Sequence, residues 1–199
     1  MTFIGPRPGI PPEAEALLAF WFDAPAPPYR NRDLWFKADP GFDAAVGGFT
    51  PLYDQAAALA LDTWEATPPG TLALVLLLDQ APRNIFRGTA RAFATDGLAR
   101  AVADRAIRRG FDRGLTPVER LFLYLPFEHS EQMADQQRSL ALFEGLFADD
   151  PSLAHLRPYV VRHLEIIDRF GRFPHRNATL GRTSTPEEEA FLRGPNSRF

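Results

Sequence analysis

The segment from Thr71 to Gln80, TLALVLLLDQ, restricts the fold of this chain more than any other, because all residues from Leu72 to Leu78 are apolar. Such a run is buried on every side, and periodicity alone does not distinguish a buried strand from a buried helix. We favour a helix, since Leu and Ala dominate and every neighbouring segment has a helical pattern. The segment is therefore predicted to be the central helix of the core. It leads directly into the polar stretch 79–84, whose groups need partners or water.

The rest of the chain also has helical patterns and helix-boundary signals, with no convincing strand. Two capping boxes begin at Thr116 and Thr185, each with proline at the first helical position, and Gly110 and Gly171 suit helix ends. We predict an all-α, single-domain bundle of antiparallel helix pairs over residues 1–199, with 1–11 as a loose arm. The predicted helices span 13–23, 40–48, 51–66, 71–80, 96–109, 117–125, 127–147, 158–170 and 186–193, with a short piece at 151–157.

Composition excludes several classes of function. The net charge of −3 argues against nucleic acid as the main partner, because duplex binding usually needs a broad basic face. The absence of Cys excludes disulfides, thiolate catalysis and thiolate metal sites. The longest apolar run is too short to cross a bilayer, and the first fifteen residues lack the features of a signal peptide. We expect a cytoplasmic protein without a membrane partner, whereas cofactor and oligomeric state stay unknown.

The stretch RFGRFPHRNATLGR, residues 169–182, reverses the sign of charge locally. It holds four arginines and His175 but no acid, within a chain that is acidic overall. Arginine presents a planar fork of donors that suits carboxylate or phosphate, and His175 has an ordinary pKa near neutrality. We interpret this basic loop as an anion-binding segment. The alternative is that its arginines pair with buried acids and brace the fold. The arginines are Arg169, Arg172, Arg176 and Arg182.

Two further polar segments carry candidate site residues. Asp79, Arg83 and Asn84 follow the central apolar run, where they either form a site or terminate the helix. His129 and Glu131 lie in PFEHSEQMADQ, with Ser130 as a candidate helix cap. The spacing lacks the His pair of a His-Glu-x-x-His metal site, so we expect no metal and instead expect these acids to neutralise the basic loop. His163 lies on an apolar helical face and is interpreted as a core residue.

The same segments resemble a known family. LLAFWFD (17–23), LLLDQAPRNIFRGTARAFATD (76–96), LFLYLPFEHSEQMADQQRS (121–139) and HLEIIDRFGRFPHRNATLGRTSTPEEEAFL (163–192) are similar to the family of unknown function numbered 924. The resemblance covers nearly the whole chain in order. It implies a tetratricopeptide-like all-α fold and a map of motif positions, but no reaction. One departure is Ala81, where the family pattern has Phe, so a ring that lines a pocket or packs the core is absent here.

These observations lead to one functional hypothesis and one alternative. The hypothesis is a pocket between helices that binds a small anionic molecule carrying phosphate or carboxylate. A hydrolase or transferase activity, with His129 or His175 as the catalytic acid or base, extends it. The alternative is a tetratricopeptide-like scaffold for a peptide, with purely structural polar motifs. The predicted ligand-binding residues are Asp79, Arg83, Asn84, Glu131, Arg169, Arg172, Arg176, Asn177 and Arg182.

Overall fold

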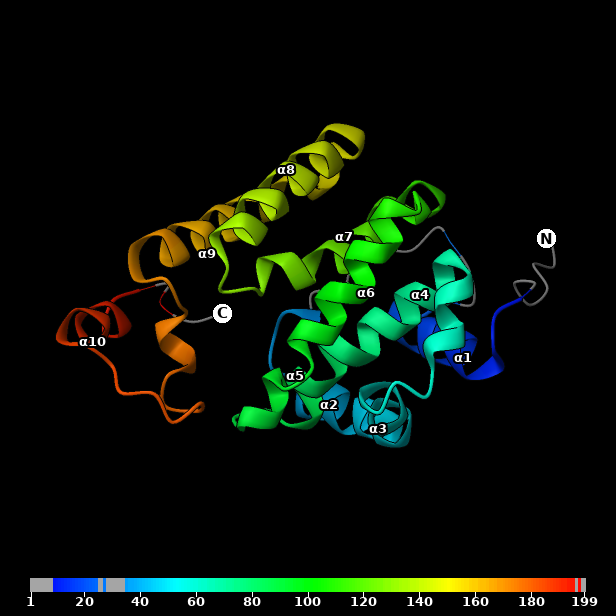
Figure 1. Cartoon of the computed structure of the whole chain (residues 1–199), viewed down its shortest axis with the longest axis horizontal. Coiled ribbons are helices and arrows are strands. Elements are labelled where there is room, and N and C mark those ends of the chain that lie inside the picture. The colour runs from blue at the N-terminus through cyan, green and yellow to red at the C-terminus, as the bar shows by residue number, and fades with distance from the viewer. Residues whose placement is uncertain (1–8, 25–26, 28–34, 196, 198–199) are drawn as a thin grey trace.

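The computed structural model describes residues 9–24, 27, 35–195 and 197. Figure 1 shows successive helices that reverse direction and pack side by side, and the described residues contain no strand. The predicted all-α bundle is therefore confirmed, whereas the tetratricopeptide-like arrangement stays a prediction. The α-helices are α1 (Pro12–Phe22), α2 (Pro40–Val46), α3 (Thr50–Ala57), α4 (Pro68–Val75), α5 (Ala81–Ile85), α6 (Asp96–Arg108), α7 (Pro117–Glu128), α8 (Met133–Asp149), α9 (Arg157–Phe170) and α10 (Pro186–Leu192).

The apolar run forms the centre of the core as a helix, as predicted. Every residue from Leu72 to Leu78 is buried, and α4 packs against α1, α6 and α7. The helix is longer than the sequence indicated, because Thr67 caps its first turn by accepting from the Gly70 amide, and α5 continues it to Ile85. Ala81 is buried within this core.

The predicted helix 51–66 is wrong beyond Ala57. The backbone turns at Leu59, which has a positive φ of 60°, and a 3-10 helix follows over Asp62–Ala66. Pro68 and Pro69, which follow the predicted end of that helix, begin α4. Proline suits this position because the first-turn amide has no intrahelical acceptor. The first eight residues of the expected N-terminal arm lie outside the described residues, and Ile10 packs against the core.

The turn between α7 and α8 corrects two boundary predictions. Pro126 does not end its helix but lies inside α7, which continues to Glu128. The next helix begins at Met133 rather than at 127, and Gln132, not Ser130, precedes it. Residues 129–132 therefore form a tight turn instead of a first helical turn. Both predicted capping boxes are present, at Thr116 and Thr185.

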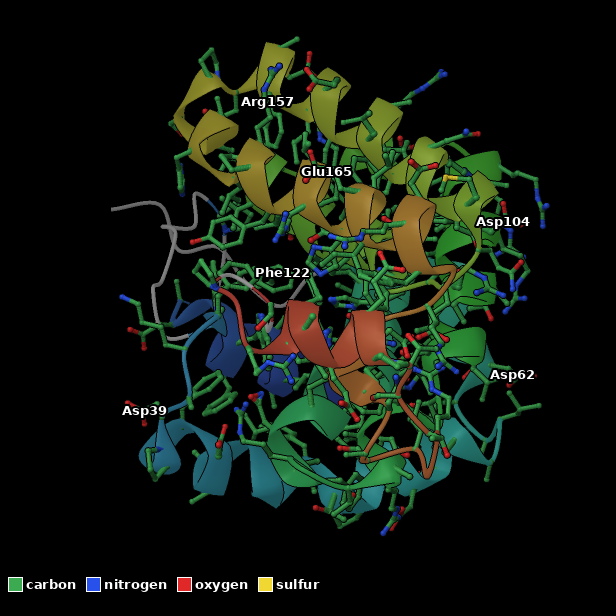
Figure 2. All side chains as sticks on the ribbon, turned by 90° about the vertical axis from the view of Figure 1, so that its left-hand side faces the viewer. Asp39, Asp62, Asp104, Phe122, Arg157 and Glu165 are labelled. Atoms are coloured by element: carbon green, nitrogen blue, oxygen red, sulfur yellow. The ribbon has the colours of Figure 1, made fainter. Side chains whose placement is uncertain are left out.

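The C-terminal part of the chain covers one side of the bundle. α7, α8 and α9 pack in sequence, and Gly171 ends α9 with a positive φ of 66°. In Figure 2, α10 (red) lies at the front, with α8 and α9 above it. A small apolar cluster, centred on Ile166, Ile167 and Phe173, holds this part together. In the described part of the chain, no helix combines the length and apolar character needed to cross a bilayer.

One side chain ties the end of the central helix to the start of α6. Residues Leu76–Gln80 form a π-helical turn, and Pro82 in the next turn has no amide to donate to Leu78. The Thr95 hydroxyl donates to the Leu78 carbonyl oxygen instead, at 2.6 Å, and both residues are buried. Thr95 immediately precedes Asp96 at the start of α6. This hydrogen bond therefore positions the polar groups described below, whereas the Thr95 side chain caps no amide of α6.

Replacing Thr95 by Val should lower the free energy of unfolding by about 1–3 kcal/mol, because the Leu78 carbonyl oxygen is then buried without a donor. Urea unfolding of the purified variant measures this change. Thr89→Val is the matched control, since the Thr89 hydroxyl also donates to a carbonyl oxygen but is exposed, where water replaces it. An equal decrease in the free energy of unfolding of the two variants would show that the buried hydrogen bond stabilises the fold no more than the exposed one.

Candidate functional site

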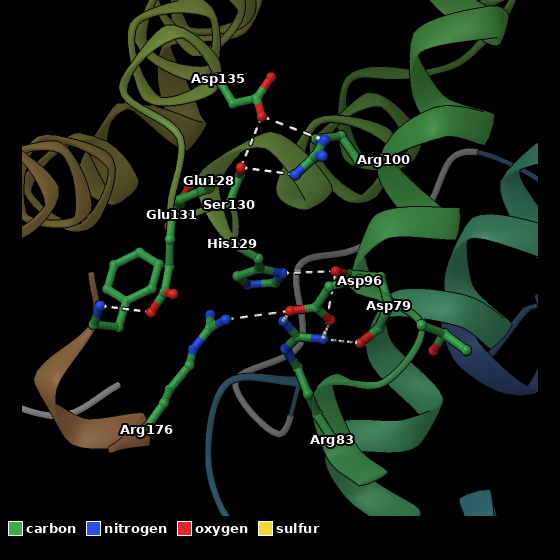
Figure 3. A network of polar contacts seen from close by, with 12 residues as sticks. Asp79, Arg83, Asp96, Arg100, Glu128, His129, Ser130, Glu131, Asp135 and Arg176 are labelled. Atoms are coloured by element: carbon green, nitrogen blue, oxygen red, sulfur yellow. Dashed lines mark hydrogen bonds and ion pairs between the residues drawn. The ribbon is translucent and has the colours of Figure 1, made fainter. Parts of the chain in front are cut away.

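A pocket of about 270 Å³ lies where three separate segments meet. One wall comes from residues 93–100 at the start of α6, and a second from the turn 129–132 between α7 and α8. The third comes from Arg176 and Leu180 in the basic loop. Figure 3 shows the polar side chains of these segments directed toward one another. We call this the His129 pocket, because the imidazole of His129 lies in its wall.

His129 is held by a buried carboxylate. Its Nδ1 lies 2.8 Å from Oδ1 of Asp79, whose side chain is completely buried (Figure 3). Burial by itself raises the pKa of Asp79. Arg83 and His129 lower this pKa by more than burial raises it, so the pKa of Asp79 is well below its usual range. Burial, together with Arg83, lowers the pKa of His129. At neutral pH the pair is therefore an ionised carboxylate and a neutral imidazole, with the Nδ1–H donating to Asp79.

Asp96 joins two arginines at the edge of the same pocket. Arg83 donates to both of its carboxylate oxygens, at 2.8 and 3.0 Å, and Arg176 donates from Nη1 at 3.2 Å. Arg83 also lies 3.5 Å from Asp79, so the acid behind His129 and the acid in the wall share this cation. These contacts connect α5, α6 and the basic loop in one network.

Arg176 is the most deeply buried cation of the basic loop. Its guanidinium carbon lies 4.7 Å from the centre of the Phe93 ring and 4.5 Å from that of Phe173. Burial, followed by the repulsion of Arg83, lowers its pKa to about 10, so it stays charged at neutral pH. Among the described residues only Nη1 has an acceptor, and the buried Nε has none. Nη2 is therefore the donor of Arg176 that a ligand can use, because Nε is buried and Nη1 already donates to Asp96.

The turn that presents His129 is braced from both sides. Gln136 donates from Nε2 to the backbone oxygens of Glu128 and Ser130, at 2.7 and 2.6 Å. The Ser130 hydroxyl donates to Asp135 and accepts from Arg100. With these contacts the turn has little freedom, and the Ser130 oxygen is already engaged. It is therefore a structural group and a poor candidate nucleophile.

The other three arginines of the basic loop are each paired with an acid. Arg182 donates to both oxygens of Glu131, and Glu131 also accepts from the Phe173 amide. Arg172 donates to both oxygens of Glu188, while Arg169 pairs with the exposed Glu187. Only Arg176 of the four lines the His129 pocket. A second hollow of about 380 Å³ lies beside the two outer pairs, but its charges already satisfy one another.

The structure brings some predicted site residues together and separates others. His129, Glu131 and Arg176 line the pocket, with Asp79, Arg83 and Arg182 directly behind them. The remaining predicted residues do not line it. Asn177 is buried and bonds Ser184, Glu188 and Arg182. The others outside the lining are Asn84, Arg169, Arg172 and His175.

Sequence reasoning missed the residues of α6 that complete the pocket. The sequence placed Asp96 at the start of a helix and, with Phe93, within a family motif, and it gave Arg100 no role. Asp96 and Arg100 are four residues apart in a correctly predicted helix, so their spacing places them on one face. That spacing is the signal that could have found them. His163, expected in the core, is buried and lies 3.0 Å from Glu128.

A metal ion bound in this network would have its acids and histidines as ligands. Among the described residues, no group of three or more His, Asp or Glu side chains is arranged to hold a metal ion. Glu131, considered with His129 as a possible metal ligand, is instead bonded to Arg182 and to the backbone.

The fold and site together define a class: an all-α protein with a His–Asp pair and a buried arginine beside one pocket. The particular family follows from comparison. Residues 17–196 match the model of a family described as "Bacterial protein of unknown function (DUF924)", and the chain belongs to this family. A solved structure of a protein of unknown function from Agrobacterium tumefaciens is similar, with 43% identity and a TM-score of 0.81 over 91% of this chain and 97% of that one. No curated protein matches.

The free energy of unfolding should fall as the pH drops below 6.5, because burial and Arg176 lower the pKa of His175 from 6.5 to about 3. Between these values the unfolded chain binds the proton and the folded chain does not. The slope is up to about 1.4 kcal/mol per pH unit for each such group. Urea unfolding at several pH values should show a smaller slope for His175→Gln than for the native protein.

The comparison assigns the effect to His175, because the two chains differ at that residue alone. Below pH 4.5 a further loss is expected, because Arg172 and the Thr185 amide lower the pKa of Glu188 to about 2. An identical slope for His175→Gln and native protein above pH 4.5 would contradict the assignment to His175.

Proposed function

We propose that the chain binds a small molecule carrying a phosphate or carboxylate group in the His129 pocket. One observation carries the proposal: Arg176 is buried beside His129, charged at neutral pH, and uses only one nitrogen for hydrogen bonds within the described residues. The Nη2 group of such a guanidinium favours an anion, because a hydrogen bond from a charged donor is stronger than one from a neutral donor. Arg100, which also lines the pocket, adds a second guanidinium that lies 3.3 Å from Asp135 and is 36% exposed.

The same geometry supports a hydrolase or transferase in which His129 exchanges a proton. Asp79 fixes the imidazole by accepting a hydrogen bond from Nδ1–H. The Nε2 atom of the neutral histidine therefore keeps its lone pair. A histidine with these properties acts as a general base when a substrate proton lies within hydrogen-bond reach. Asp79 then acts as the positioning group. His175 lies outside the pocket lining, and we assign it no step.

A second candidate function is an interaction scaffold with purely structural polar motifs. The observation in its favour is that Arg169, Arg172 and Arg182 are each occupied by an acid. Against it, the motif residues 79, 83, 129, 131 and 176 converge on one pocket rather than along an extended groove. A cytoplasmic location and the tetratricopeptide-like arrangement remain predictions.

Binding of inorganic phosphate and citrate, measured by titration calorimetry, tests the proposal. Arg176→Gln and Arg100→Gln should each weaken binding of the better probe by about tenfold or more, because a hydrogen bond to a charged group contributes about 1.5–3 kcal/mol. Arg100→Gln is included because Arg100 is partly exposed and its loss should disturb the fold less.

Arg172→Ala is the matched control for charge. It removes one arginine of the same loop that is paired with an acid outside the pocket, and it should leave the dissociation constant within about twofold. Equal weakening in all three variants would indicate nonspecific electrostatics. Failure of both probes, and of a wider panel of phosphorylated and carboxylated metabolites, would favour the scaffold.

A further inference from the structure

The hydrogen bond from His129 to Asp79 decides which imidazole nitrogen can react. Asp79 is fully buried and ionised, and an ionised carboxylate only accepts hydrogen bonds. The proton of the neutral ring must therefore be on Nδ1. Nε2 then carries a lone pair, and it has no hydrogen-bond partner among the described residues. A ring held in this tautomer, with Nε2 left for the pocket, is suited to act as a nucleophile and not only as a base.

The charges around this nitrogen suit a phosphoryl group. Arg100 and Arg176 line the same pocket, and Arg176 has donors to spare. The pocket wall contains two acids, Asp96 and Glu131. Arg83 donates to Asp96 and Arg182 donates to Glu131, both from behind the wall. Their negative charge is thereby offset. Phosphoryl transfer depends mainly on positioning and on cations that stabilise the three equatorial oxygens.

We propose that Nε2 of His129 accepts a phosphoryl group from a phosphorylated small molecule bound in this pocket. The inference rests on the proposed function, because the donor must first bind. The Nε2 lone pair forms a bond to phosphorus as the bond from phosphorus to the leaving oxygen breaks. That oxygen leaves with the electron pair. The Nδ1 proton stays on the ring, shared with Asp79, which stabilises the positive charge that develops on the imidazole.

The other histidines lack this combination of features. His163 uses Nδ1 for the Tyr159 carbonyl oxygen and Glu128, and it is buried. His155 is exposed and its Nδ1 contacts the Ser152 carbonyl oxygen. His175 does not line the pocket. The proposal therefore predicts phosphorylation at one histidine, and His155 serves as an internal measure of nonspecific modification.

The experiment uses acetyl phosphate as the donor and the full chain at neutral pH. Intact-mass measurement without acid should show the addition of one phosphoryl group, and peptide fragmentation should place it on His129. The rate at His129 should exceed the rate at His155 by about tenfold or more. The adduct should be lost on brief acid treatment and retained in base, as a phosphoramidate bond requires. His129→Gln should abolish the fast phase.

Two further variants separate reaction from structure. Asp79→Asn should slow phosphorylation, because the amide no longer fixes the tautomer or stabilises the developing charge. Arg100→Gln keeps the Asp79–His129 pair and the hydrogen bond from Ser130 to Asp135, and it should slow phosphorylation as well. Melting curves confirm that each variant is folded before its rate is used. Equal rates at His129 and His155 in the native protein would overturn the inference.

Phosphate binding, measured on the same preparation, distinguishes the two levels of the account. If phosphate binds and Arg176→Gln weakens it, but acetyl phosphate does not modify His129, the phosphoryl-transfer inference is wrong and the proposed anion site stands. If phosphate, citrate and the wider panel all fail to bind and acetyl phosphate does not modify His129, both the inference and the anion site are wrong.

Discussion

The carboxylate of Asp96, shared by Arg83 and Arg176, is the interaction on which the site depends. Each arginine comes from a different part of the chain, one from α5 and the other from the basic loop. Burying a guanidinium is costly unless an acid compensates for it, and the lowered pKa of Arg176 reflects this cost. The shared acid allows two cations to lie close to His129. Without it, Arg83 and Arg176 would repel one another at the edge of the core.

The backbone of the central helix prepares this arrangement. Pro82 cannot donate a hydrogen bond, and the π-helical turn before it places Asp79 and Gln80 inside the protein. The Leu78 carbonyl oxygen, which receives no hydrogen bond from Pro82, accepts one from the Thr95 hydroxyl. This hydrogen bond places the neighbouring Asp96 beside Arg83. Local irregularities of this kind occur often at functional sites. Here, an interrupted helix supplies both the buried acid behind His129 and the anchor for the opposite wall of the pocket.

Much of the fold follows from local signals in the sequence. Both capping boxes, the Gly171 helix end and the buried helix at 71–80 could be predicted because each depends on neighbouring residues. One error concerns proline: Pro126 was taken as a helix end, although proline also fits inside a helix. Another concerns α3, which ends early because the backbone turns at Leu59. The candidate site was only partly predictable. His129 and Arg176 stood out by residue type, but their partners Asp79 and Asp96 lie 50 and 80 residues away. The partner of Arg172 could not be assigned either, because Glu188 lies 16 residues away in α10.

The central claim is that Asp79 holds His129 as a neutral imidazole with its proton on Nδ1. Long-range proton–nitrogen NMR correlation of the imidazole nitrogens at about pH 7 tests it directly. The account predicts a protonated Nδ1 and an unprotonated Nε2 for His129, with a change in tautomer or line shape in Asp79→Asn. A proton on Nε2, or a doubly protonated ring at this pH, would contradict the account.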